Sequence, residues 1–188
     1  HPVHLFDNVR DYTTKFERSR EFTLSFEVSS VKVPWFAANW ADEFVAASVT
    51  DRALLSVARM QSEMLEAIDK TKVANKPLLV LSFENAVTNP QDSIDKLEKF
   101  LNRSVTRRTK KVLKQQNLPR TQISAGKATS SFSFTSNGAS SEAEIYKKIA
   151  NEISSNGSEK AIAEFKSAIT VYNLRLPSQL TELEKILA

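Results

Sequence analysis

The sequence predicts an α/β protein that is mostly helical and contains a small parallel sheet. Two patterns support this prediction. Most apolar residues recur every three or four positions, as on one face of an amphipathic helix, whereas Leu78–Leu81 form a short apolar run without alternation, which is typical of a strand buried in a parallel sheet. With 188 residues, of which 41% are hydrophobic and 26% charged, the chain fits a single packed domain over residues 1–188.

The first forty residues predict a helix followed by an extended, aromatic segment. Apolar side chains at helical spacing favour an amphipathic helix that ends near Arg20: Leu5, Val9, Tyr12 and Phe16. From Phe22 to Val28 apolar and polar residues alternate, which is the pattern of a half-buried strand or an extended hairpin arm. The stretch Val33–Trp40 holds both tryptophans, and either core packing or the wall of a ligand pocket would explain it.

Two helices in the middle of the chain have clear boundary signals. A long apolar stripe predicts a helix from Thr50 or Asp51 to about Lys72. After the expected strand, Asn89-Pro90 supplies an N-cap and a proline at the first helical position. The helix that begins there carries an apolar stripe and is expected to stop at Asn102, which tolerates the left-handed conformation of a helix end.

The last third of the chain is predicted to be helical apart from one loop. A helix over Val105–Asn117 carries many basic residues. Residues 123–138 are rich in Ser, Thr, Ala and Gly, and they predict a long flexible loop. Three further helices are expected to begin near Ser141, Ser158 and Pro177, because a polar cap or a turn residue precedes an apolar stripe at each point.

Positive charge is concentrated in one segment. The whole chain has a net charge of +4, but the stretch from Arg103 to Ser141 contains eight cations and no Asp or Glu. These cations are Arg103, Arg107, Arg108, Lys110, Lys111, Lys114, Arg120 and Lys127. Either a solvated basic helix face or an anion-binding site explains such a run, and the sequence leaves both interpretations open.

Residue types exclude several classes of functional site. The chain has no cysteine, so it has no disulfide framework, thiolate zinc site or thiol nucleophile. Its three glycines, Gly126, Gly138 and Gly157, cannot form a dinucleotide fingerprint or a Gly-rich phosphate loop. His1 and His4 lack further ligands, so we expect no metal site. The sequence has no apolar run of about eighteen residues and no signal-peptide pattern, and we expect a soluble, cytoplasmic protein without membrane contact.

The segment Lys76–Arg103 carries the most specific pattern in the chain. The expected strand ends in a predicted turn at Phe83-Glu84-Asn85, a helix begins at Asn89-Pro90, and this helix closes on Phe100-Leu101-Asn102. The order of these features resembles the second half of sulfotransferases that use 3′-phosphoadenosine 5′-phosphosulfate (PAPS). The resemblance covers roughly residues 51–131, and it implies a P-loop-NTPase-like sulfotransferase fold that lacks its N-terminal part.

The resemblance assigns four residues to the binding of PAPS, the sulfuryl donor. His1-Pro2 matches the end of an Arg-x-Pro motif, which places Asn8 where the family has a serine that holds the 3′-phosphate. Phe83 stands where the family has a tyrosine near the adenine, and Gly126 and Lys127 correspond to a flexible basic loop that closes over the 3′-phosphate. Ordinary structural explanations stay open: Asn8 as a helix residue, Phe83 as core and Lys127 as a solvated charge.

The implied activity is sulfuryl transfer from PAPS to a hydroxyl or amine of a small-molecule or glycan acceptor. In the family, the phosphosulfate loop and the catalytic histidine precede the Arg-x-Pro motif. We therefore expect the chain alone to be inactive, and we assign no catalytic residue. His4 is a poor candidate for the catalytic base. Residues 22–40 match nothing in the family and are predicted to be an acceptor-side insertion. The alternative is a noncatalytic helical module that binds an acidic partner or nucleic acid through residues 103–127; the sulfotransferase interpretation itself predicts no nucleic-acid partner.

Overall fold

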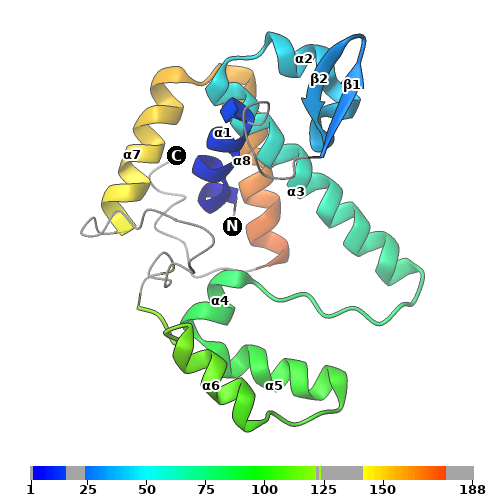
Figure 1. Cartoon of the computed structure of the whole chain (residues 1–188), viewed down its shortest axis with the longest axis vertical. Helices are drawn as coiled ribbons and strands as arrows, with labels where there is room; N and C mark the ends of the chain where they lie inside the picture. Colours follow the sequence, from blue (N-terminus) through cyan, green and yellow to red (C-terminus); the bar gives the residue numbers. More distant parts are fainter. Residues whose placement is uncertain (1, 16–23, 122, 124–141, 177–188) are drawn as a thin grey trace.

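The computed structural model describes residues 2–15, 24–121, 123 and 142–176 of the chain. These residues are mostly helical, as predicted, and they contain one two-stranded antiparallel sheet (Figure 1). In chain order the elements are α1 (Pro2–Lys15), β1 (Ser25–Val28), β2 (Val31–Pro34), the 3₁₀ helix η1 (Trp35–Trp40), α2 (Ala41–Ala46), α3 (Val49–Val73), α4 (Phe83–Thr88), α5 (Pro90–Leu101), α6 (Arg107–Gln115), α7 (Glu142–Asn156) and α8 (Glu159–Arg175).

Helices α1, α3, α7 and α8 enclose the main hydrophobic core (Figure 1). Each of them contributes side chains that are almost fully buried, among them Phe6, Leu54, Ile153 and Phe165. The rings of Phe6 and Phe165 meet in a tilted contact with their centroids 6.5 Å apart. At the turn between α7 and α8 only glycine fits, because a Cβ on Gly157 would lie 2.8 Å from the Ile153 carbonyl oxygen.

Helices α3 and α8 run parallel through this core. Three contacts join them at successive levels: Asp51 with Ser158, Arg59 with Glu164, and Asp69 with Arg175. The sequence separations of the three pairs are 107, 105 and 106 residues, so the two helices advance together in the same direction. Both begin at serine caps, since Ser48 Oγ accepts from the Asp51 N–H and Ser158 Oγ accepts from the Ala161 N–H.

A smaller apolar cluster joins the β-hairpin to the core. Strands β1 and β2 pair antiparallel, and the turn residues Ser29 and Ser30 have φ of 50° and 66°, as a two-residue hairpin turn requires. Val33 and Phe44 are buried in this cluster, and Trp40 packs against both clusters. The predicted hairpin arm is thus confirmed over the described residues. The assignment of residues 22–40 as an insertion stays a prediction.

Residues 76–121, called the lobe below, contain α4, α5 and α6 and lie beside the core (Figure 1). Helices α4 and α5 pack on each other and bury Val87 and Ile94. Glu84 in the first turn of α4 is only 3% exposed, and the Tyr172 hydroxyl of α8 donates to its carboxylate at 3.4 Å. This buried contact links the lobe to the core.

The predicted parallel sheet is absent from the described residues. Leu78–Leu81 form a non-helical segment without strand pairing, and Leu78 is 41% exposed. A parallel sheet needs a second strand beside this one, and the two strands described, β1 and β2, pair with each other at the top of the molecule in Figure 1, away from this segment. The strand prediction is therefore wrong for the described residues, and the P-loop-NTPase-like fold stays a prediction.

The predicted boundaries of α3 and α5 are confirmed, although the Asn89 side chain makes no capping hydrogen bond. Helix α3 begins after Ser48 and reaches Val73, and helix α5 begins at Pro90 and is followed by Asn102 in the left-handed conformation with φ 48°. Helices α6, α7 and α8 also lie where the sequence predicts them.

The predicted turn at Phe83–Asn85 is wrong, because these residues form the first turn of α4. Ser82 Oγ accepts a hydrogen bond from the Asn85 N–H at 3.1 Å and thereby caps a helix. The end of the first helix near Arg20, all but the first residue of the predicted loop 123–138 and the last predicted helix lie outside the described residues.

Candidate functional site

Helix α6 is the strongest candidate for a binding surface. It begins at a capping box, in which Thr106 Oγ1 accepts from the Thr109 N–H and Thr109 Oγ1 accepts from the Thr106 N–H, each at 3.4 Å. Thr109, Leu113 and Gln116 are half-buried and recur at the spacing of one helix face, which turns this face toward the protein. None of the α6 residues is buried, so the helix lies on the surface.

Four cations of α6 share its opposite face. Arg107, Lys110, Lys111 and Lys114 occupy positions i, i+3, i+4 and i+7, and Arg108 flanks them. All five side chains are exposed, and none makes an ion pair within the part of the chain that the structure describes. These five residues are called the basic face below.

The basic face is electrostatically unfavourable on its own. Like charges three or four residues apart on a helix destabilise it by about 0.2–0.5 kcal/mol for each pair. The first turn of α6 contains no acid but has Arg107 and Arg108 at the positive end of the helix dipole. A bound polyanion would remove both sources of repulsion, because its charges would lie well within the screening length of about 8–10 Å.

Exposed apolar side chains lie at the end of α5, the helix that precedes α6 in the chain. Ile94 in the first half of α5 is buried, whereas Leu97, Phe100 and Leu101 in the second half are 38%, 43% and 58% exposed. Helix α4, which packs on α5, has only six residues, whereas α5 has twelve. The apolar stripe predicted for this helix is thus only half covered within the described residues.

Two of the four residues assigned to PAPS, Asn8 and Phe83, lie in the described part of the chain, and the assignment of all four stays a prediction. Asn8 is exposed on α1, which packs on α3, α7 and α8. Phe83 lies at the start of α4 and is 56% exposed, so its interpretation as a core residue is wrong. Gly126 and Lys127 lie outside the described residues.

The surroundings of Asn8 do not fit a phosphate group. Asp7 precedes it, Asp11 follows one turn later, and Arg10 is bound by Asp7, Asp11 and Glu152. Burial raises the pKa of Asp7, against the effect of Arg10, and the charges of Glu152 and Asp11 raise it further. Two carboxylates thus flank Asn8 in the sequence, and the cation described beside them is already neutralised, which disfavours a phosphate there.

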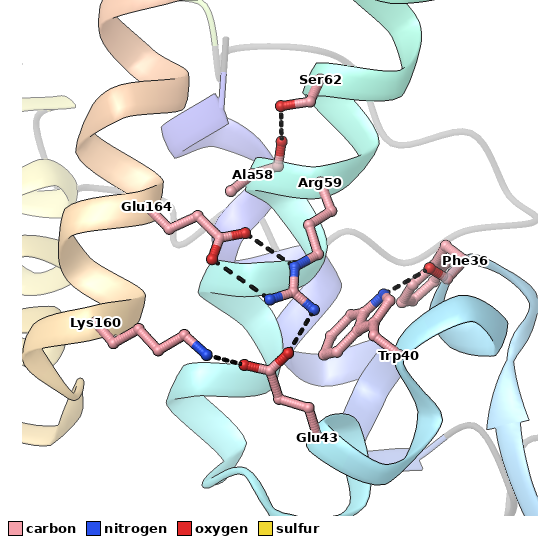
Figure 2. Close-up of polar contacts among 8 residues, drawn as sticks. All are labelled: Phe36, Trp40, Glu43, Ala58, Arg59, Ser62, Lys160 and Glu164. Carbon is pink, nitrogen blue, oxygen red and sulfur yellow. Dashed lines mark hydrogen bonds and ion pairs between the residues drawn. The ribbon is translucent and has the colours of Figure 1, made fainter.

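Sequence analysis missed a charged cluster at the centre of the fold (Figure 2). Arg59 of α3 binds Glu164 of α8 at 2.9 Å and Glu43 of α2 at 2.8 Å, and Lys160 binds Glu43 at 2.6 Å. The Arg59 guanidinium also lies 4.4 Å from the centroid of a Trp40 ring. Figure 2 shows that these side chains converge from η1, α2, α3 and α8.

This cluster stabilises the fold and leaves no acid or base free for catalysis. Hydrogen bonds from Arg59 and Lys160 lower the pKa of Glu43. Burial acts to lower the pKa of Arg59, but its hydrogen bonds to Glu164 and Glu43 outweigh this effect and raise it. Two cations therefore balance two carboxylates. The cluster had no local sequence signal, because Arg59 and Glu164 are 105 residues apart.

A second buried polar contact, between Glu84 and Tyr172, anchors the lobe. Ser82 Oγ donates to the Glu84 carboxylate at 2.9 Å, and the Tyr172 hydroxyl donates to the same oxygen at 3.4 Å. Burial and the neighbouring Glu84 charge raise the pKa of Tyr172 well above its ordinary value. The tyrosine therefore stays a neutral donor. The sequence carried one signal of this contact, an acid two residues after the capping serine.

The described residues also form a shallow groove between α3 and α8, with a volume of about 340 Å³. Three carboxylates line it, and each has a cationic partner: Glu66 with Lys70, Asp69 with Arg175, and Glu164 with Arg59. The groove consequently offers no unpaired charge to a ligand, unlike the basic face.

The chain matches no protein-family model, and the curated proteins and the solved structures likewise gave no match. Within the described ranges, no cluster of His, Asp or Glu could hold a metal ion. None of the helices that the structure describes is both long and apolar enough to span a lipid bilayer. Among the described residues, the surface of α6 is therefore the candidate site.

Proposed function

We propose that the protein is a noncatalytic helical module that binds an acidic macromolecule through the basic face of α6. One observation carries this proposal: four cations lie on one exposed helix face and have no ion-pair partner in the described part of the chain. Structural lysines and arginines of the core behave differently, because Arg10, Arg59 and Lys160 each bind a carboxylate. An unpaired, self-repelling cluster is better explained by a partner than by folding.

The shape of the site supports a polyanion over a small anion. The basic face extends from Arg107 to Lys114, a rise of about 10 Å along a helix at 1.5 Å per residue. Such a row can contact several charges of a phosphodiester backbone or an acidic polypeptide at once. Binding by charge alone releases counterions, so affinity must fall steeply as salt is added.

Charge reversal on the basic face tests this proposal. We expect Lys110→Glu to weaken binding of fluorescein-labelled single-stranded DNA, or of poly-glutamate, and to reduce the slope of log affinity against log salt by about one. The variant is expected to fold, because the new carboxylate lies one turn before Lys114 and forms a favourable pair worth about 0.2–0.5 kcal/mol. Lys166→Glu, on the exposed side of α8, is the matched control for net charge.

The outcomes separate the two kinds of partner. Binding of DNA alone identifies a phosphodiester backbone, and binding of poly-glutamate alone identifies an acidic protein. If Lys110→Glu and Lys166→Glu weaken binding equally, only net charge matters and the proposal is wrong. Absence of binding to either polymer at about 50 mM salt would also contradict it, because electrostatic binding is strong under that condition.

Sulfuryl transfer from PAPS stays a prediction of the sequence resemblance. The boundaries of α5 agree with the resemblance, while the acids around Asn8 argue against a phosphate there. Calorimetry with adenosine 3′,5′-bisphosphate and AMP distinguishes the two functions. A donor site would bind only the bisphosphate, and Lys127→Ala would weaken that binding by roughly 1–3 kcal/mol, whereas the basic face would not discriminate between the two nucleotides to that extent.

A further inference from the structure

The groove between α3 and α8 combines buried apolar residues with carboxylates. Three of its lining residues are apolar and buried: Ala58, Leu65 and Ala168. Three others are acids: Glu66 and Asp69 of α3, and Glu164 of α8, which Figure 2 shows reaching toward α3. The volume of about 340 Å³ lies within the range of roughly 300–1,000 Å³ in which proteins bind small molecules. The groove therefore has the size and the mixed lining of a ligand site.

Gln61 of α3 adds a buried amide that has no partner. The residue lines the groove and is only 8% exposed. Neither the oxygen nor the nitrogen of its side chain forms a hydrogen bond with any residue that the structure describes, and the oxygen is fully buried. Burying an unbonded amide is unfavourable, so most such groups in proteins bind a water molecule or a ligand. A half turn about the last side-chain torsion exchanges the two atoms, so the amide can present either a donor or an acceptor to the groove.

The charges of the groove favour a cationic ligand. Arg175 is the only cation among its described lining residues, whereas Lys70 and Arg59, which also pair with its acids, lie outside the lining. Lys70 and Glu66 are both exposed, and so is the pair of Arg175 and Asp69. Exposed pairs contribute little to stability, so a ligand can share these carboxylates. The whole chain carries a net charge of +4, so a cation that binds here is attracted by the groove and not by the net charge of the protein.

The spacing of the carboxylates indicates a long ligand. Glu164 lies at the level of Arg59, which it binds at 2.9 Å, and Glu66 follows seven residues later on α3. At 1.5 Å per residue, this places the two acids about 10 Å apart along the helix axis. Gln61 lies between these two levels, and the buried Leu65 lies on the same helix face one turn later. A linear polyamine matches this order, because it has ammonium groups at both ends, methylene groups between them and an inner amine.

We propose that the groove between α3 and α8 binds a linear aliphatic polyamine. The terminal ammonium groups bind Glu66 and Glu164, the methylene groups cover Leu65, and an inner amine donates to the Gln61 oxygen. Binding thereby gives the buried amide the partner that it lacks. This site does not depend on the proposed function, because the groove lies in the core and the basic face lies in the lobe.

Titration calorimetry of the full chain with spermidine, at about 10 mM salt, tests the site. We expect a dissociation constant of about 1 mM or lower. Gln61→Leu should raise this constant roughly tenfold, because it removes a hydrogen bond to a charged group. The same substitution should not lower the melting temperature, since it replaces an unbonded buried amide by an apolar side chain of similar size. A purely structural role of Gln61 predicts the reverse, a loss of stability with unchanged binding.

Two carboxylates of α3 provide a matched control for charge. Glu66→Gln removes an acid of the groove and should raise the dissociation constant of spermidine about two- to fivefold. Glu63→Gln removes an exposed acid outside the groove lining and should leave the constant unchanged. If both substitutions weaken binding equally, only surface charge attracts the polyamine and the proposal is wrong.

The side-chain amide of Gln61 provides a direct readout in the wild type. Its NMR signals should shift when spermidine is added, and a monoamine such as butylamine should shift them much less, because it cannot reach two carboxylates at once. Equal shifts with both amines would contradict a site that spans Glu66 and Glu164. Absence of a spermidine-dependent shift overturns the proposal, and so does a Gln61→Leu variant that binds spermidine as tightly as the wild type. A chain that binds no spermidine up to about 10 mM overturns it as well.

Discussion

The core and the lobe are built from the same kinds of residues but use them differently. In the core, apolar residues such as Phe6 and Phe165 are buried, and cations such as Arg59 are paired with carboxylates. In the lobe, Phe100 and Leu101 are exposed, and the cations of α6 have no ion-pair partner among the described residues. The core therefore supplies the stability of the fold. The lobe leaves apolar and cationic side chains on its surface.

The largest expected effect is in the core. Phe165→Ala should lower the free energy of unfolding by about 3–5 kcal/mol, because it leaves a cavity among α1, α3 and α8. Urea unfolding followed by tryptophan fluorescence measures this change, since Trp40 packs on the same core. A loss below about 1 kcal/mol would show that the core is less tightly packed than the buried fraction of Phe165 implies.

Disrupting the charged cluster of Figure 2 should lower the free energy of unfolding by a smaller amount. Arg59→Met removes the cation that joins Glu43 to Glu164 and should cost roughly 1–3 kcal/mol, since both carboxylates are only partly solvated. The pH dependence gives a second readout. Because the pKa of Glu43 is lowered in the folded protein, its contribution is present above the unfolded pKa and is lost as the pH falls through the folded value. Stability of Arg59→Met should therefore fall less steeply in acid.

Breaking the contact between lobe and core should lower the free energy of unfolding less than Arg59→Met does. Tyr172→Phe removes the hydroxyl that donates to Glu84 and should cost about 0.5–1.5 kcal/mol. Hydrogen exchange of the α4 amides should accelerate more than that of α3, because the lobe opens before the core unfolds. Equal acceleration in both helices would mean that lobe and core unfold as one unit.

The smallest effect is expected at the exposed end of α5. Leu101→Ser should change the free energy of unfolding by less than about 0.5 kcal/mol, because this side chain is already 58% exposed. Thermal unfolding at low protein concentration measures it. A destabilisation above about 1 kcal/mol would show that the end of α5 is covered by other residues, as the core helices are.

Local sequence signals predicted the helices of both regions well. The Asn89-Pro90 start and the Asn102 end of α5 follow from backbone geometry that neighbouring residues fix, and they hold in the structure. The apolar stripes of α3 and α8 likewise predicted which faces are buried. Turn and helix starts were harder to separate. A serine side chain that accepts a hydrogen bond from an N–H three residues later, as Ser82 does from Asn85, occurs both at helix starts and in isolated turns.

Features that depend on distant residues were not predictable. The apolar pattern of Leu78–Leu81 indicates a strand but cannot indicate where its neighbour lies, and the described chain supplies none. Side chains from three helices and η1 form the cluster around Arg59, and no spacing along the chain marks it. The candidate site was predicted in part. The cations of α6 were evident from composition, whereas the acids around Asn8 act through the packing of α1 on α7.

The parallel course of α3 and α8 determines how the chain between them can change. The chain leaves α3 at Val73 and must travel back along its length, about 37 Å at 1.5 Å per residue, before α8 can begin at Glu159. No tight turn can make this connection. Because loop-closure entropy grows only by about 0.6 kcal/mol for each doubling of loop length, enlarging an already long return path costs little. The lobe and α7 share that path, so a longer lobe would leave the mutual packing of α3 and α8 unchanged.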